Sequence, residues 1–215
     1  GCTVVLKPAE QTSLTALLLA ELIQETDFPP GVVNVVTGYG NTAGSDLVAH
    51  AGVNKITFTG SVETGKIVGT RAVQGMKRFT LELGGKSPVI VRADADIDAA
   101  IQGASKAIFF NQGQTCTAGS RLYVHESIYD TVVQGVAEFA NNISVAPGYE
   151  SGCEMGPLVS IEQLERVTGY IEAGKQEKAE ILAGGDHIDR PGYFLAPTVL
   201  ATRQEMSVVQ EEIFG

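Results

Sequence analysis

With 215 residues, the chain is long enough to bury a hydrophobic core, either as one large domain or as two smaller ones. Its 44% hydrophobic and 19% charged residues exclude a disordered chain. The net charge of -10, without a local basic patch, argues against a nucleic-acid or anionic-membrane partner, and the longest apolar stretch is too short to span a membrane.

Strand and helix patterns alternate at short spacing in the first part of the chain. The predicted strands occupy residues 3–7, which read as buried, and residues 31–38, 55–60 and 78–85. The predicted helices occupy residues 12–26, which form an amphipathic segment with a Thr or Ser cap, and residues 42–51 and 61–73. This order predicts a parallel sheet with crossover helices, which binds ligands where strands end and helices begin.

The second part of the chain is again of the α/β type. Strands are predicted at residues 87–91, 121–125, 179–185 and 194–200, and helices at residues 96–110, 127–143 and 160–177. Gly84-Gly85 marks the predicted boundary. We therefore expect one domain over residues 1–84 and a second over residues 85–215.

The three cysteines, Cys2, Cys116 and Cys153, are too few and too scattered for a disulfide framework. No pair has the spacing of metal ligands, so no metal site is expected. A reducing, cytoplasmic setting is the prediction. The sequence begins without Met and ends without a terminal cap, which leads us to expect an internal piece of a longer protein, lacking both ends.

One cysteine stands out by its surroundings. In "FFNQGQTCTAGSR", Cys116 follows an apolar run and has a glycine three residues before it and another three after. Backbone of this kind suits a nucleophile that a substrate must approach, whereas a structural cysteine usually lies on a strand or helix face. The alternative is a turn residue whose thiol has no chemical role.

Two further motifs suit the binding of a nucleotide. In "FTGSVETG", Gly60 and Ser61 join a strand to a helix, where a phosphate could meet unpaired N–H groups, although a Ser cap explains the same residues. In "LKPAE", Lys7 and Glu10 follow the first strand. A carboxylate there could bind ribose hydroxyls and repel a 2′-phosphate, which favours NAD over NADP, but a surface charge pair is the alternative.

Glu82 is the candidate general base. It stands between Leu81 and Leu83 in "LELGGKSP", and burial in such an apolar setting would favour its neutral form, as a base near neutral pH requires. The alternative is a glutamate on the solvent face of the strand, which strand alternation allows equally.

Taken together and in this order, "LKPAE", "FTGS", "LELGGKSP", "FFNQGQTC" and "EEIFG" resemble the aldehyde dehydrogenase superfamily along the whole chain. The resemblance implies a Rossmann-like coenzyme-binding sheet followed by an α/β catalytic domain, and NAD(P)-dependent oxidation of an aldehyde to a carboxylic acid. It also implies a homo-oligomer, a dimer or tetramer, in the intact protein.

The resemblance also implies roles for individual residues. Cys116 would be the catalytic thiol and Glu82 the base that activates water. The coenzyme would contact Lys7, Glu10, Gly40, Gly60, Ser61, Glu212 and Phe214. The aldehyde would contact Phe110, Thr115 and Thr117. In this scheme the thiolate adds to the aldehyde, hydride passes to the nicotinamide, and water hydrolyses the resulting thioester.

One expected element is missing. The family's second oxyanion donor is an Asn upstream of "LKPAE", so we expect these 215 residues alone to be weak or inactive. Three alternatives stay open: a thiol esterase without a redox step, a binding protein without turnover, and an acyl-CoA-forming member of the family. The features at the nucleotide edge argue against the first, intact Cys116 and Glu82 against the second, and Glu82 against the third. The sequence leaves the particular aldehyde open.

Overall fold

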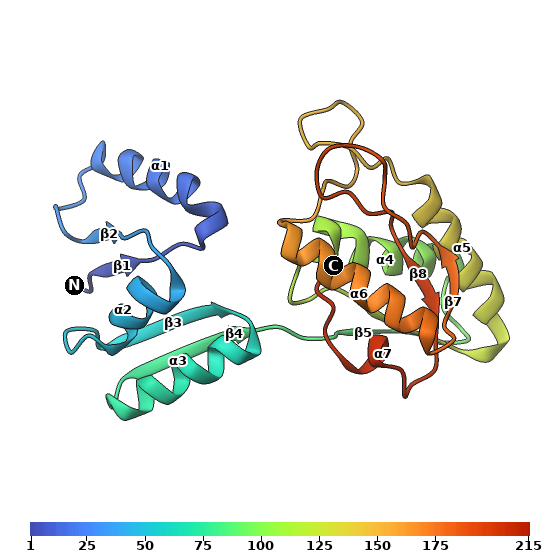
Figure 1. Ribbon diagram of the computed structural model, residues 1–215, viewed down its shortest axis with the longest axis horizontal. Helices are drawn as coiled ribbons and strands as arrows, with labels where there is room; N and C mark the ends of the chain where they lie inside the picture. The colour runs from blue at the N-terminus through green and yellow to red at the C-terminus, as the bar shows by residue number, and fades with distance from the viewer. The chain divides into compact units, whose positions relative to one another are not determined.

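The computed structural model describes all residues 1–215, which form two compact units. The N-terminal unit comprises Gly1–Leu83 and the C-terminal unit comprises Gly84–Gly215 (Figure 1). Both units combine helices with strands, and three of the four strand pairs are parallel, so the chain has the α/β fold that the alternating pattern predicts.

The elements of the N-terminal unit follow the predicted order. Its strands are β1 (Val4–Leu6), β2 (Val33–Val35), β3 (Lys55–Gly60) and β4 (Arg78–Leu83). Its α-helices are α1 (Ser13–Gln24), α2 (Ser45–Ala49) and α3 (Val62–Gln74), with a 3-10 turn over Glu10–Thr12 and a π turn over Gly40–Gly44. The hydroxyl-bearing Thr12 precedes α1, but its side chain does not cap the helix.

The strands of this unit form two parallel pairs. β1 pairs with β2, with Val4 opposite Val33, and β3 pairs with β4, with Lys55 opposite Arg78. The predicted parallel pairing of strands is confirmed, with the strands arranged as two pairs. β1 and β2 have three residues each, against six in β3 and β4, so they offer few backbone groups for further pairing.

Only one side of the N-terminal unit has a buried core. Ile56 of β3 packs with Val68 and Ala72 of α3, which covers the β3-β4 pair. By contrast, β1 was predicted to be buried, and all three of its residues are exposed. α1 buries none of its residues either, because the leucines of its apolar pattern meet no second layer within this unit.

The C-terminal unit contains more helix. Its strands are β5 (Pro88–Val91), β6 (Arg121–Val124), β7 (Glu180–Ala183) and β8 (Val199–Ala201). Its α-helices are α4 (Ile97–Phe109), α5 (Tyr129–Asn142), α6 (Ile161–Gln176) and α7 (Ser207–Gln210), with 3-10 turns over Phe110–Gly113 and Glu126–Ile128. The predicted strand over residues 194–200 is much shorter: β8 begins only at Val199, and the loop before it buries Phe194 and Leu195.

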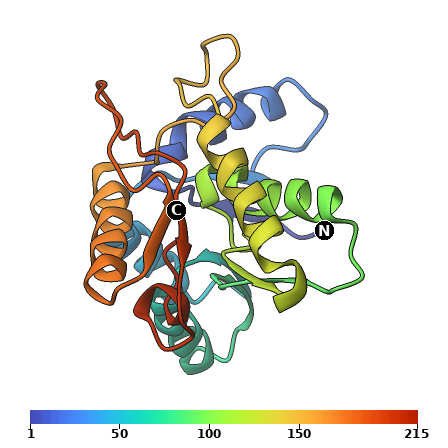
Figure 2. The same cartoon turned by 90° about the vertical axis from the view of Figure 1, so that its right-hand side faces the viewer.

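The core of the C-terminal unit lies between its helices and strands. β5 and β6 are parallel, whereas β7 and β8 are antiparallel with a bulge. α4 and α5 pack against each other, and Val132 and Val136 of α5 join Val91 and Ala104 in the buried cluster (Figure 2). None of the helices in the structure is long and apolar enough to cross a membrane.

Candidate active site

Cys116 lies at the tip of a tight turn in the C-terminal unit. The backbone N–H of Ala118 donates to the carbonyl of Thr115 over 3.1 Å, so Cys116 and Thr117 are the two central residues of the turn. Both are exposed, while Ala118 and Gly119 behind them are buried. A second bond, from the N–H of Gly119 to the carbonyl of Ala107 over 2.9 Å, fixes the turn to α4.

The chain reverses sharply between α4 and this turn. Asn111, Gln112 and Gly113 all have left-handed backbone, with φ of 50°, 58° and 72°. The Asn111 side chain supports the reversal by donating to the carbonyl of Gln114 over 3.1 Å. At Gly113 a Cβ atom would lie 3.1 Å from the backbone of Gly215, so glycine suits both the conformation and the space.

The double glycine of "LELGGKSP" lies against this turn and against Glu212. A Cβ atom on Gly85 would approach the carbonyl oxygen of Cys116 to 3.1 Å, and one on Gly84 would collide with the Glu212 carboxylate. The backbone N–H of Gly85 donates to Oε1 of Glu212 over 2.6 Å. Glu212 of "EEIFG" and the thiol turn are thus neighbours of the same two glycines.

Two further predicted residues line a cavity of the C-terminal unit together with Glu212. Thr115, Glu212 and Phe214 border this cavity of about 510 Å³. Phe214 has left-handed backbone with φ of 64°, which is uncommon for a residue with a side chain. Phe110, predicted to contact the aldehyde, is 73% exposed and, like Cys116 and Thr117, does not line the cavity.

Lys86 has a buried amine in the same region and was not among the residues predicted from the motifs. Its Nζ atom is inaccessible to solvent and has no hydrogen-bond partner. Burial, reinforced by the nearby Arg121 guanidinium and opposed by Glu212, lowers the pKa of Lys86 to about 8. The short side chains around it in "GGKSP" were the only sign of close packing in the sequence.

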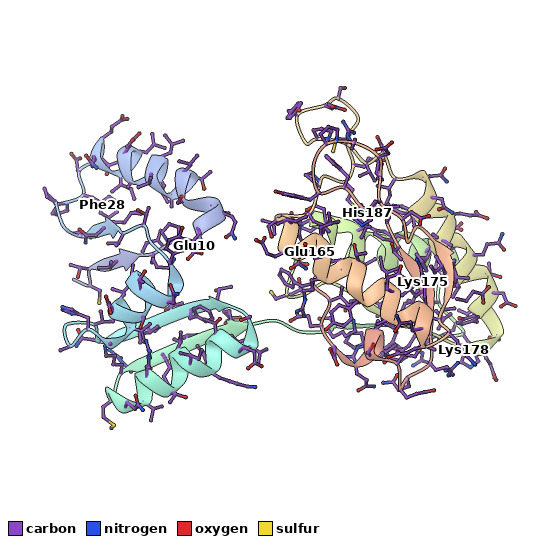
Figure 3. The ribbon with its side chains drawn as sticks, in the orientation of Figure 1. Glu10, Phe28, Glu165, Lys175, Lys178 and His187 are labelled. Atoms are coloured by element: carbon purple, nitrogen blue, oxygen red, sulfur yellow. The ribbon has the colours of Figure 1, made fainter.

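The N-terminal unit brings Lys7, Glu10 and Gly40 together. The backbone N–H of Gly40 donates to Oε1 of Glu10 over 2.8 Å, and Nζ of Lys7 lies 3.5 Å from the same oxygen. The ammonium of Lys7 also donates to the carbonyls of Pro8 and Gly38 over 2.7 and 2.8 Å. Glu10, labelled in Figure 3, begins the 3-10 turn that precedes α1.

These contacts keep Glu10 ionised. Hydrogen bonds from its own backbone N–H and from Gly40, with a smaller effect of the Lys7 ammonium, lower the pKa of the Glu10 carboxyl. Its side chain is nevertheless 38% exposed and free to accept further hydrogen bonds. An exposed carboxylate of this kind can accept hydrogen bonds from hydroxyl groups of a ligand.

At two predicted residues of this unit, the structure shows the alternative that the sequence left open. Glu82 is exposed on β4, because it points away from the side on which Leu81 and Leu83 are partly buried, so the argument from its burial is wrong for this chain. Ser61 caps α3: its Oγ accepts from the N–H of Thr64 over 3.2 Å and lies 3.0 Å from Thr64 Oγ1. Next to it, Gly60 leaves room for the Phe58 ring.

The structure contains no group of three or more His, Cys, Asp or Glu side chains placed to hold a metal ion. Cys153, the third cysteine, is half-buried, and its Sγ lies 3.0 Å from the carbonyl of Ala146, to which it donates. Of the two exposed cysteines, Cys2 and Cys116, only Cys116 lies in a turn beside other candidate site residues.

Comparison with known proteins decides the family. The pattern of the aldehyde dehydrogenase family matches residues 1–215, the whole chain. The chain belongs to the aldehyde dehydrogenase family. It is 51% identical over 218 residues to the phenylacetaldehyde dehydrogenase of Pseudomonas fluorescens, covering 100% of this chain and 43% of that protein.

Other relatives agree in fold and in extent. The cytosolic aldehyde dehydrogenase 1 of Mus musculus is 50% identical over 217 residues, which cover 100% of this chain and 43% of that protein. The structure of an aldehyde dehydrogenase of Bacillus cereus in complex with NAD+ superposes with a TM-score of 0.98 at 50% identity, covering 100% of this chain and 44% of that one. The chain thus spans less than half the length of these relatives.

Proposed function

We propose that the full-length protein carrying this chain is an NAD-dependent aldehyde dehydrogenase that releases a free carboxylic acid, with Cys116 as its nucleophile. The observation that carries the proposal is the exposed thiol of Cys116 at the tip of a fixed turn, beside the glycines that bind Glu212. Membership of the family and the NAD+ complex of the Bacillus cereus relative support the coenzyme and the reaction class.

The turn around Cys116 supports addition of the thiolate to an aldehyde. The substrate carbonyl becomes an oxyanion as the carbon–sulfur bond forms, and the backbone N–H of Cys116 is a candidate donor to that oxygen. Thr115 and Thr117 flank the thiol, and Phe110 lies on the surface before it. We propose these three residues as substrate contacts.

The coenzyme would be held by groups from both units. In the N-terminal unit, Lys7 and Glu10 would bind the adenosine ribose beside Gly40, and Gly60 and Ser61 would meet the pyrophosphate at the start of α3. In the C-terminal unit, Glu212 and Phe214 would hold the nicotinamide ribose and ring. When bound, NAD supplies the acceptor for the hydride that leaves the substrate carbon.

Hydrolysis then needs a base. Glu82 would take a proton from water as the water attacks the thioester carbon, which releases the acid and restores the thiol. Exposure of Glu82 in this chain is compatible with that role, because the water must reach the carboxylate. We also propose a cytoplasmic location and a homo-oligomeric state for the full-length protein; the presence of a cytosolic enzyme among its relatives supports the location.

The choice of coenzyme tests this proposal. In the full-length protein, kcat/KM should favour NAD over NADP by about tenfold or more, because the ionised Glu10 faces the 2′-phosphate and close like charges cost about 1–4 kcal/mol. NADH and NADPH formation would be followed with a panel of aromatic and aliphatic aldehydes. Glu10→Gln should narrow the ratio, whereas Glu25→Gln, a change at an exposed glutamate that ends α1, should leave it unchanged.

Two results would contradict the proposal. If no aldehyde of the panel yields reduced coenzyme, the protein is not an aldehyde dehydrogenase. A clear preference for NADP would remove the ribose role of Glu10 and with it the assignment of NAD.

A further inference from the structure

One face of α6 holds the segment Glu211–Gly215. Gln163, Arg166 and Tyr170 have the spacing i, i+3 and i+7, which places them along one side of the helix. All three side chains donate hydrogen bonds to this segment. In Figures 1 and 2 the red end of the chain runs beside the orange α6.

Gln163 and Arg166 bind the backbone of the segment. Nε of Arg166 donates to the carbonyl of Ile213 over 3.0 Å, and Nη2 donates to the carbonyl of Glu212 over 2.5 Å. Nε2 of Gln163 donates to the carbonyl of Phe214 over 2.7 Å. Three successive carbonyls therefore have partners on α6, which stabilises the left-handed backbone of Phe214.

Tyr170 connects these contacts with the core. Its ring packs against the buried cluster of Met206, Val208 and Val209, and its hydroxyl donates to Oε2 of Glu211 over 2.7 Å. The guanidinium of Arg166 lies 5.3 Å from the centre of the ring. Burial, together with the bond to Glu211, raises the pKa of Tyr170, so the hydroxyl stays protonated and remains a donor.

The position of this segment fixes the Glu212 carboxylate. Glu212 follows Glu211 directly and accepts the N–H of Gly85, whose backbone lies against the carbonyl of Cys116. A shift of Glu211 would therefore move the carboxylate of Glu212 away from Gly85. Tyr170 itself touches neither Gly85 nor the thiol turn, so any effect there must pass through the segment.

We propose that Tyr170 is a positioning residue, which acts through Glu211 and Arg166 to place Glu212 and Phe214 for the nicotinamide half of NAD. The inference rests on the proposed function, because that function assigns Glu212 and Phe214 to the coenzyme. In the proposed function, Tyr170 contacts neither NAD nor the aldehyde.

Tyr170→Phe in the full-length protein tests the inference, since it keeps the ring and removes only the hydroxyl. The KM for NAD should rise about tenfold, as expected for loss of a hydrogen bond to a charged group, while the KM for the aldehyde stays unchanged. Tyr193→Phe is the matched control, because the Tyr193 hydroxyl has no hydrogen-bond partner in the structure. Glu211→Ala should raise the KM for NAD to the same extent, and the double variant Tyr170→Phe, Glu211→Ala should add little to either change.

A second readout does not depend on turnover. Amide hydrogen exchange at Gly85 should be faster in Tyr170→Phe than in Tyr193→Phe, because the acceptor of that N–H becomes less well held. Equal exchange at Gly85 in the two variants overturns the inference, even if the protein oxidises no aldehyde. Faster exchange with an unchanged KM for NAD overturns it as well. An inactive wild-type protein contradicts the proposed function, and exchange at Gly85 still decides whether Tyr170 positions Glu212.

Discussion

At the scale of single residues, the sequence identified Glu82 as a candidate but did not determine whether it is buried. Its position before two glycines drew attention to it. Its exposure depends on which side of β4 it lies on, and the flanking leucines did not determine that side. Lys86 was missed for a related reason: its burial comes from residues distant in the sequence, such as Glu212 and Arg121. In contrast, Lys7, Glu10 and Gly40 follow the ends of two paired strands and lie together in the structure, while their role as coenzyme contacts stays a prediction.

The proposed role of Glu82 predicts a separation of the two half-reactions. If Glu82 activates only the water that hydrolyses the thioester, Glu82→Gln should still release about one equivalent of NADH per site in a rapid burst. Steady turnover should then fall by about 100-fold or more, the usual contribution of a general base. Stopped-flow absorbance of NADH measures both phases. Loss of the burst together with turnover would show that Glu82 also activates Cys116.

Among the elements, the strand predicted at 55–60 is β3, but the helix predicted at 42–51 is only α2, and α7 was not predicted. The predicted helix at 61–73 is α3, Val62–Gln74, since Ser61 supplies a local cap that the sequence displays. The strands β1 and β8 are shorter than predicted, and α1 is exposed, because both strand length and burial depend on neighbours that periodicity does not reveal. The stripe of α6 that holds Glu211–Gly215 could be recognised only once both segments were placed.

Variants of Ser61 can separate its role in capping α3 from its proposed role at the pyrophosphate. Ser61→Ala should lower the free energy of unfolding by about 1 kcal/mol, the usual cost of an N-cap. Ser61→Asp keeps a capping oxygen, so stability should stay within about 0.5 kcal/mol, but its charge should raise the KM for NAD about tenfold. Chemical denaturation and steady-state kinetics measure the two effects. If the KM for NAD is unchanged in Ser61→Asp, Ser61 only caps α3 and does not contact the pyrophosphate.

At the scale of the whole molecule, the candidate residues are divided between the two compact units. Lys7, Glu10, Ser61 and Glu82 belong to the N-terminal unit, and Cys116, Glu212 and Phe214 to the C-terminal unit. We predicted that the double glycine separates a coenzyme-binding domain from a domain with the catalytic thiol. This division of function remains a prediction.

The reactivity of Cys116 tests the central claim most directly. The full-length protein would be alkylated briefly with iodoacetamide at neutral pH and then analysed by peptide mapping. Cys116 should be labelled before Cys2 and before Cys153, whose thiol donates a hydrogen bond to a backbone carbonyl. NAD or an aldehyde should change the rate at Cys116 alone, and Cys116→Ser should abolish aldehyde oxidation with the fold intact. Faster labelling of Cys153 or Cys2, or aldehyde oxidation by Cys116→Ser at a rate comparable with the wild type, would contradict the assignment of Cys116 as the nucleophile.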